Sequence, residues 1–141
     1  MTKNAQAHWE GSLKQGKGNM QVGSGSYNSE YEAASRFESG NGTNPEELIG
    51  AAHAGCYSMS LAKTLTEAGH EPKRVDTKAA VELEKSGDGF QISTITLTTE
   101  AEVPGMDENV FTKLANQARD DCVVSKALKG VTIDLKTNLR S

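Results

Sequence analysis

The most constraining feature of this chain is a long run of small and apolar residues near its centre, which begins after Asn44 and contains a cysteine, Cys56. Between Leu48 and Leu61, the polar side chains are limited to those of His53, Ser58, Ser60 and the phenol of Tyr57. A helix that is apolar on nearly every face is typical of the middle of a structure. Its many alanines and glycines would also let another backbone approach closely. The fold is therefore expected to be built around this segment.

Both ends of the helix are marked in the sequence. Asn44 is a favourable N-cap, and Pro45 occupies the first helical position, where a missing N–H costs nothing. Glu47 follows the cap by three residues, and from there its carboxylate can reach back to the cap N–H. Gly69 is expected to end the helix after about Ala68. The sequence thus predicts one long helix over these residues.

Shorter periodic segments flank this helix on both sides. Before the helix, they predict a first hairpin from Ala7–Ser12 and Lys17–Val22 and a weak strand at Tyr31–Glu38. After the helix, they predict an antiparallel hairpin from Arg74–Glu84 and Phe90–Glu102. A second helix capped by Asp107, a helical turn after Cys122 and a last strand from Val131 to Leu139 are expected to follow. This order is typical of an α+β fold. We predict a single domain over residues 1–141, with an antiparallel sheet packed on the long central apolar helix.

The supply of large apolar residues is small. Leu, Ile, Val and Phe account for 25 of the 141 residues, below the roughly 20% at which disorder is suspected. The net charge of −4 is too modest, and the segments are too periodic, for a disordered chain. A thin core that is completed by another copy of the chain reconciles these observations. We therefore expect an intertwined homodimer.

Charge and hydropathy exclude several classes of partner. The 15 basic and 19 acidic residues form no basic stripe, so nucleic-acid binding lacks its electrostatic footprint. No apolar run reaches the roughly 18 residues of a membrane span, and residues 1–10 contain no apolar core of a secretory signal. Two cysteines in such a chain indicate a reducing compartment, where thiols are more often catalytic than structural. A cytoplasmic location is expected.

The two cysteines, Cys56 and Cys122, lie 66 residues apart. Neither belongs to a CxxC pair or lies near clustered histidines, so the usual zinc spacings are absent. Free cysteines often simply pack in a core, and that interpretation stays open for both. Cys122, however, precedes a short helical turn, and a helix N-terminus stabilises a thiolate. A buried thiol with one distant partner suits a redox enzyme in which one cysteine is oxidised and the other resolves it.

A family resemblance supports the redox interpretation. The stretch Arg36-Phe37-Glu38 and the run from Gly42 to Cys56 closely resemble the OsmC/Ohr family of thiol-dependent peroxidases, and the OsmC branch in particular. The similarity extends to Ala7-His8-Trp9-Glu10-Gly11 and to Val103-Pro104-Gly105-Met106-Asp107, and so runs over essentially the whole chain. The motif on the central helix is specific.

The resemblance implies a set of roles. Cys56 matches the peroxidatic cysteine, which attacks an organic hydroperoxide and becomes a sulfenic acid, and Cys122 matches the resolving cysteine. Arg36 and Glu47 match an active-site pair that holds and polarises the thiolate and the peroxide. An external dithiol, of lipoyl type in the family, restores the thiols. The cycle uses no cofactor: no metal, flavin or haem takes part. Peroxide cleavage needs a thiolate near a cation, and a guanidinium can supply that charge.

Helix geometry adds a constraint on Glu47. It lies nine positions before Cys56, which corresponds to half a turn net and about 13 Å along one helix. If Glu47 serves Cys56, it is expected to come from the other subunit of the dimer. The chain also departs from the family pattern Cys-Pro-x-Ser, because Val123 follows Cys122 while Ser125 is kept. Proline would have fixed φ at this turn.

The same residues allow other interpretations. His53, three residues before Cys56, could be the general base of a cysteine hydrolase, but no oxyanion loop or orienting acid is evident. Apolar side chains of Leu48, Met59 and Phe111 could form a pocket for organic rather than hydrogen peroxide. The alternative from another class is a non-catalytic dimer on the same scaffold, which binds small apolar ligands and whose cysteines are merely buried.

Overall fold

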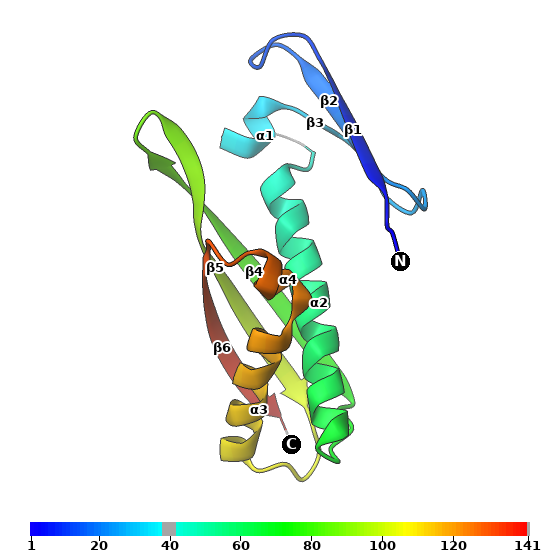
Figure 1. The fold of residues 1–141 in the computed structure, drawn as a ribbon, viewed down its shortest axis with the longest axis vertical. Coiled ribbons are helices and arrows are strands. Elements are labelled where there is room, and N and C mark those ends of the chain that lie inside the picture. The colour runs from blue at the N-terminus through cyan, green and yellow to red at the C-terminus, as the bar shows by residue number, and fades with distance from the viewer. Residues whose placement is uncertain (38–41, 141) are drawn as a thin grey trace. The chain divides into compact units, whose positions relative to one another are not determined.

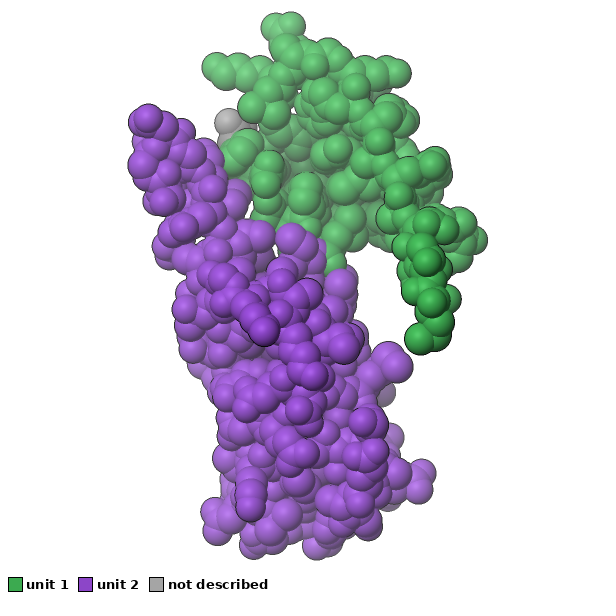
Figure 2. Space-filling model, in the orientation of Figure 1, with its two compact units in different colours: residues 1–48 green, residues 49–141 purple. Residues whose placement is uncertain are grey.

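A computed structural model describes residues 1–37 and 42–140. The chain forms two compact units, residues 1–48 and residues 49–141, which are described separately (Figure 2). Each unit contains one three-stranded sheet, and the helices are distributed over both (Figure 1). The predicted α+β class is confirmed. Among the described residues, no helix is long and apolar enough to cross a membrane.

Unit 1, residues 1–48, contains an antiparallel meander of β1 (Ala5–Glu10), β2 (Lys17–Val22) and β3 (Asn28–Tyr31). The predicted first hairpin is therefore confirmed, with a small shift of its first strand.

The predicted strand at Tyr31–Glu38 is wrong. β3 ends where that strand was to begin, and α1 (Ala33–Phe37) follows, while Glu38 lies outside the described residues. The segment opens with two alanines, which favour helix. The Ser35 hydroxyl then ties the turn together by donating to the carbonyl oxygens of Glu32 (2.6 Å) and Thr43 (2.8 Å).

The long central helix is α2 (Pro45–Glu67). Asn44 caps it, since its Oδ1 accepts a 2.8 Å hydrogen bond from the N–H of Glu47. The chain leaves the helix through Gly69, whose φ of 89° is the left-handed conformation that glycine adopts most easily. Both predicted ends are confirmed. One stripe of α2 nevertheless faces solvent in the single chain, and it consists of Ala51, Ala52, Gly55 and Met59.

Unit 2, residues 49–141, contains a sheet of order β4 (Arg74–Ser86), β5 (Gly89–Glu102) and β6 (Thr132–Arg140). β4 and β5 form the predicted antiparallel hairpin, but β5 and β6 pair in parallel. The sheet is thus not antiparallel throughout. Two helices between β5 and β6 carry the chain back to the starting end of β5, so that β6 runs in the same direction.

A β-bulge in β5 adjusts which residues face the core. The register shifts between Glu82 and Leu83, where β5 contains one extra residue, Ser93. Because of this extra residue, Ile92 and Ile95 both contribute to the hydrophobic cluster although they are three positions apart.

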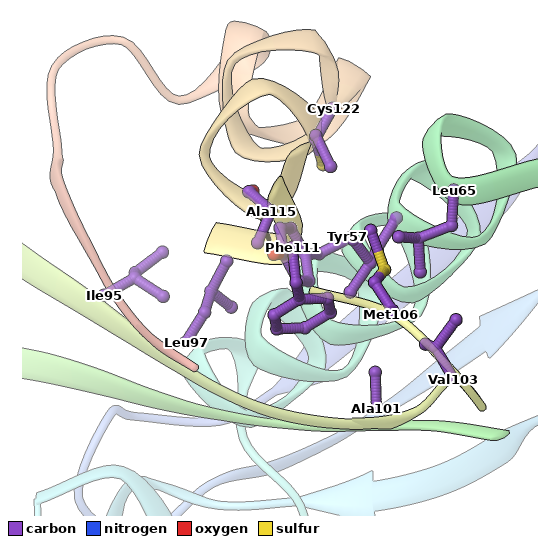
Figure 3. Close-up of a cluster of buried hydrophobic side chains, with 12 residues drawn as sticks. Tyr57, Leu65, Ile95, Leu97, Ala101, Val103, Met106, Phe111, Ala115 and Cys122 are labelled. Carbon is purple, nitrogen blue, oxygen red and sulfur yellow. Dashed lines mark hydrogen bonds between the residues drawn. The ribbon is translucent and has the colours of Figure 1, made fainter. Parts of the chain in front are cut away.

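The connecting helices are α3 (Glu108–Asp121) and α4 (Val123–Ala127). The Asp107 carboxylate caps α3 by accepting from the N–H of Val110 (3.0 Å). The core of unit 2 forms where α2, α3 and β5 meet, with Tyr57, Phe111 and Leu97 at its centre (Figure 3). This core positions the segment between α3 and α4, which contains the second cysteine.

Candidate active site

The structure brings the two cysteines together. Cys56 lies partway along α2, and Cys122 is at once the C-cap of α3 and the N-cap of α4. The backbone of Cys122 is extended, with φ −61° and ψ 122°, and this break between the helices turns its side chain toward α2. The two Sγ atoms are 3.2 Å apart and both thiols are free. They are about 1 Å farther apart than the roughly 2.05 Å of a disulfide bond.

The two thiols differ in exposure. Cys56 is half-buried, whereas Cys122 is 1% exposed and belongs to the hydrophobic cluster. A dissolved oxidant can therefore reach Cys56, while Cys122 is accessible mainly to Cys56.

The pKa values of the two thiols are shifted in opposite directions. Burial raises the pKa of Cys56, and the neighbouring Cys122 adds to this, while the N–H groups of Val124 and Val123 act in the opposite direction. For Cys122, burial likewise acts to raise the pKa, but hydrogen bonds outweigh it. These come from the N–H and hydroxyl of Ser125, the Cys56 thiol and the N–H of Val124, and the pKa of Cys122 is lowered.

A second polar pair lies in unit 1. The Arg36 guanidinium binds Glu46 Oε1 through both Nε (2.7 Å) and Nη2 (2.6 Å). The Glu46 side chain is 9% exposed, and its Oε2 has no hydrogen-bond partner among the described residues. The Glu47 carboxylate is exposed and accepts a long hydrogen bond of 3.5 Å from the Thr43 hydroxyl.

The structure therefore pairs Arg36 with Glu46, whereas the family resemblance implies Glu47 as the carboxylate partner of Arg36. Both glutamates suit the start of a helix, so composition and spacing do not separate them. Glu46 is buried because of where α1 lies, and the sequence predicts a strand instead of a helix in that segment.

The side chains expected to line an apolar pocket each have different surroundings. Phe111 is 1% exposed in the core of unit 2, and Met59 is 76% exposed on the stripe of α2. Leu48 lines a hollow of about 360 Å³ in unit 1 together with Met20 and Tyr27. His53 is fully buried, and its Nε2 hydrogen-bonds the Ser125 Oγ (2.8 Å), beside Cys122.

Known proteins resemble this chain over most of its length. The family model described as OsmC-like protein matches residues 38–136. Peroxiredoxin OsmC of Escherichia coli is 48% identical over 134 residues, which cover 94% of each chain. Organic hydroperoxide resistance protein OhrB of Bacillus subtilis is 30% identical over 104 residues, which cover 73% of this chain and 74% of the relative.

A solved structure shares the fold. The crystal structure of an organic hydroperoxide resistance protein OsmC from Legionella pneumophila superposes with a TM-score of 0.74 over 100% of this chain and 98% of that chain, at 22% identity. The family match, the sequence similarity and the fold agree. The chain belongs to the OsmC family.

Proposed function

We propose that this protein is a thiol-dependent peroxidase, which reduces organic hydroperoxides to alcohols through Cys56 and Cys122. The observation that carries the proposal is the Sγ–Sγ distance of 3.2 Å between one accessible and one buried thiol. The relatives named a peroxiredoxin and an organic hydroperoxide resistance protein support the same activity. We further propose that residues 1–141 act as a single domain.

In the first step, the Cys56 thiolate attacks the outer oxygen of the hydroperoxide. A sulfur–oxygen bond forms as the oxygen–oxygen bond breaks, and the alkoxide leaves with a proton as the alcohol. Sulfur is oxidised by two electrons to a sulfenic acid. Cys56 is the reacting thiol because it is the more exposed of the two.

In the second step, the Cys122 thiolate attacks the Cys56 sulfur. A disulfide forms, and hydroxide departs with a proton as water. The lowered pKa of Cys122 suits this role, since the thiolate is the nucleophile. An external dithiol, of lipoyl type, then reduces the disulfide by two exchanges. The electrons come from thiols throughout, so the cycle needs no cofactor.

Arg36 is proposed to supply the cation of the site. A guanidinium beside Cys56 would offset the burial that raises the pKa of Cys56, and would also stabilise the departing alkoxide. Contacts favour Glu46 over Glu47 as the carboxylate that orients it. Glu46 lies ten positions before Cys56, about 15 Å along one helix. We therefore propose that Arg36 and Glu46 serve Cys56 of a second copy.

That second copy would form a homodimer. Three observations support it: the small share of large apolar residues, the apolar stripe of α2, and the apolar hollow of unit 1. Organic substrates and a dithiol would be the small-molecule partners, and neither nucleic acid nor a membrane is a proposed partner. Two free thiols suit the reducing conditions of the cytoplasm, which we propose as the location.

Peroxide turnover separates this function from the alternative, a dimer that only binds small apolar ligands. We expect one equivalent of cumene hydroperoxide to convert the wild type to an intramolecular disulfide, detected by mass spectrometry. Cys56→Ser should show neither oxidation nor dithiol-dependent peroxide loss. Cys122→Ser should accumulate the sulfenic acid. Two unreacted thiols in the wild type would exclude the peroxidase and favour the binder. If hydrogen peroxide were reduced as efficiently as cumene hydroperoxide, the proposed preference for organic substrates would be excluded.

A further inference from the structure

We infer that His53 and Ser125 form a buried hydrogen-bond relay that holds Cys122 as the thiolate for the resolving step. This inference rests on the proposed peroxidase function and deepens it. His53 does not contact the substrate in this proposal, and it acts on Cys122 through Ser125 as a positioning residue.

The first observation is the contact itself. His53 Nε2 and Ser125 Oγ are 2.8 Å apart, and the two residues are 0% and 8% exposed. They come from different elements, since His53 lies on α2 and Ser125 on α4. Cys122 is the N-cap of that same α4. The relay therefore links the helix of Cys56 to the short helix that begins at Cys122.

The second observation fixes the direction of the hydrogen bond. Burial lowers the pKa of His53, so its imidazole is neutral and has one N–H. Nδ1 has no partner among the described residues. A proton on Nδ1 would make it a buried donor without a partner, which is rarer in folded proteins than an acceptor without one. The proton is therefore assigned to Nε2, which donates to the Ser125 oxygen.

This assignment decides where the Ser125 proton points. Its oxygen accepts from His53, so its O–H is free to donate elsewhere. The Ser125 hydroxyl and the Ser125 backbone N–H are both among the groups that lower the pKa of Cys122. A thiolate accepts hydrogen bonds from such donors better than a thiol does. With the opposite tautomer of His53, the hydroxyl would donate to the imidazole and Cys122 would lose this donor.

The relay also gives a role to His53, which the two cysteines alone leave without one. A fully buried histidine on an apolar helix is costly unless it is hydrogen-bonded. Leucine would fill that space without this cost, whereas the hydrogen bond to Ser125 offsets part of it for the imidazole. Other titratable groups near Cys122 are Cys56 and the Tyr57 phenol, which donates to the carbonyl oxygen of Ala115 (3.0 Å).

A single-turnover experiment tests the relay. After one equivalent of cumene hydroperoxide, rapid quenching and mass spectrometry separate Cys56 oxidation from disulfide formation. We expect His53→Leu and Ser125→Ala to slow disulfide formation about tenfold relative to oxidation, since Ser125→Ala removes a donor to the thiolate and His53→Leu removes the group that orients this donor. His53→Gln and Ser125→Thr keep a donor and should restore most of the rate. His8→Leu and Ser58→Ala are matched controls that remove an imidazole or a hydroxyl elsewhere.

A titration provides an independent readout. In a Cys56→Ser background, thiolate absorbance near 240 nm reports Cys122 alone, and His53→Leu should raise its midpoint by about one pH unit, the equivalent of a tenfold change. An unchanged midpoint, an equal slowing of both steps, or a failure of the Gln and Thr variants to restore the rate would overturn the relay. If the wild type forms no oxidised species, the proposed function fails, and the titration still decides the relay.

Discussion

The two units of the molecule differ in what they bury. All of the buried hydrophobic side chains found among the described residues lie between Tyr57 and Cys122, in unit 2. Among the residues of unit 1 that the structure describes, the buried ones are Gly18, Ser35, Thr43 and Glu46, which are small or polar. Unit 2 thus has its own core and positions the thiols with it. Unit 1 offers a guanidinium–carboxylate pair and an apolar hollow, but residues 1–37 and 42–48 contain no buried apolar core that would stabilise it alone.

The largest expected effect tests this difference in stability. Leu61→Ala removes a fully buried side chain from the core of unit 2 and should lower the free energy of unfolding by about 2–5 kcal/mol. Val22→Ala in unit 1 removes a side chain that is 36% exposed, and it should cost less than about 1 kcal/mol. Urea unfolding of both variants measures the contrast. Equal costs would show that unit 1 has a comparable core of its own.

The next prediction concerns chemistry rather than stability. Arg36→Met should lower kcat/KM for cumene hydroperoxide by about 10²–10³-fold, as expected for loss of a charge that stabilises the leaving oxygen. The thermal midpoint should also fall, because the change leaves the buried Glu46 carboxylate without its cation, so the assay is run well below that midpoint. Arg74→Met, which also removes an exposed guanidinium paired with a carboxylate, is the control and should keep full activity. Unchanged activity in Arg36→Met would exclude the proposed catalytic role of Arg36.

The apolar stripe of α2 gives a test of the dimer. Met59 is 76% exposed in the single chain. Met59→Glu should weaken self-association about 10–100-fold, because dimerisation would bury an unpaired charge from each copy. Sedimentation across a range of concentrations measures this, with Lys113→Glu on the exposed face of α3 as the control. An unaltered dimer would place the interface on another surface.

The two neighbouring glutamates should also differ in effect. Glu46→Gln removes the negative charge that binds Arg36 and leaves an uncharged amide at the buried position. Because Arg36 then loses its charged partner, we expect the kcat/KM of the peroxidase to fall about tenfold. Glu47→Gln alters an exposed carboxylate and should change the rate by less than about twofold. Peroxidase assays of the two variants side by side distinguish them. The reverse order would restore Glu47 as the catalytic carboxylate.

The outcome for these glutamates illustrates what the sequence could and could not predict. Caps and breakers fixed the ends of α2 at Asn44 and Gly69, because they act locally, and those predictions were confirmed. The parallel pairing of β5 and β6 was missed, because strand direction depends on how the intervening helices pack. The choice between Glu46 and Glu47 likewise depends on tertiary contacts of α1.

The proximity of the two sulfurs shows the same distinction. No spacing rule brings together residues that are 66 positions apart, and the family resemblance alone implied their pairing. The structure places their sulfurs 3.2 Å apart because Cys122 lies at the junction of α3 and α4, and both of these helices pack against α2. The partnership of His53 with Ser125 has the same origin and left no signal in the sequence beyond a histidine on an apolar helix.

The smallest expected effect comes from Val123, where the family usually has proline. Val123 is the first residue of α4, its side chain is 68% exposed, and Cys122 before it has the extended backbone that proline requires of its predecessor. Val123→Pro should therefore stabilise the fold by about 0.4–1 kcal/mol. It also removes the N–H that lowers the pKa of Cys56. Because that N–H is the weakest of the groups acting on Cys56, oxidation by hydroperoxide should slow only about two- to threefold.

Val123→Ala separates the two contributions, since it keeps the N–H while removing the exposed side chain. The thermal midpoint and the rate of sulfenic acid formation are measured on the same samples. In Val123→Pro, the midpoint should rise and the rate should fall. In Val123→Ala, both should hardly change. A proline variant that is both more stable and faster would mean that the N–H of Val123 does not assist Cys56. Valine at this position would then loosen the turn without benefit. The predicted pattern would instead mean that the chain trades a small amount of stability at the turn for a more reactive thiol.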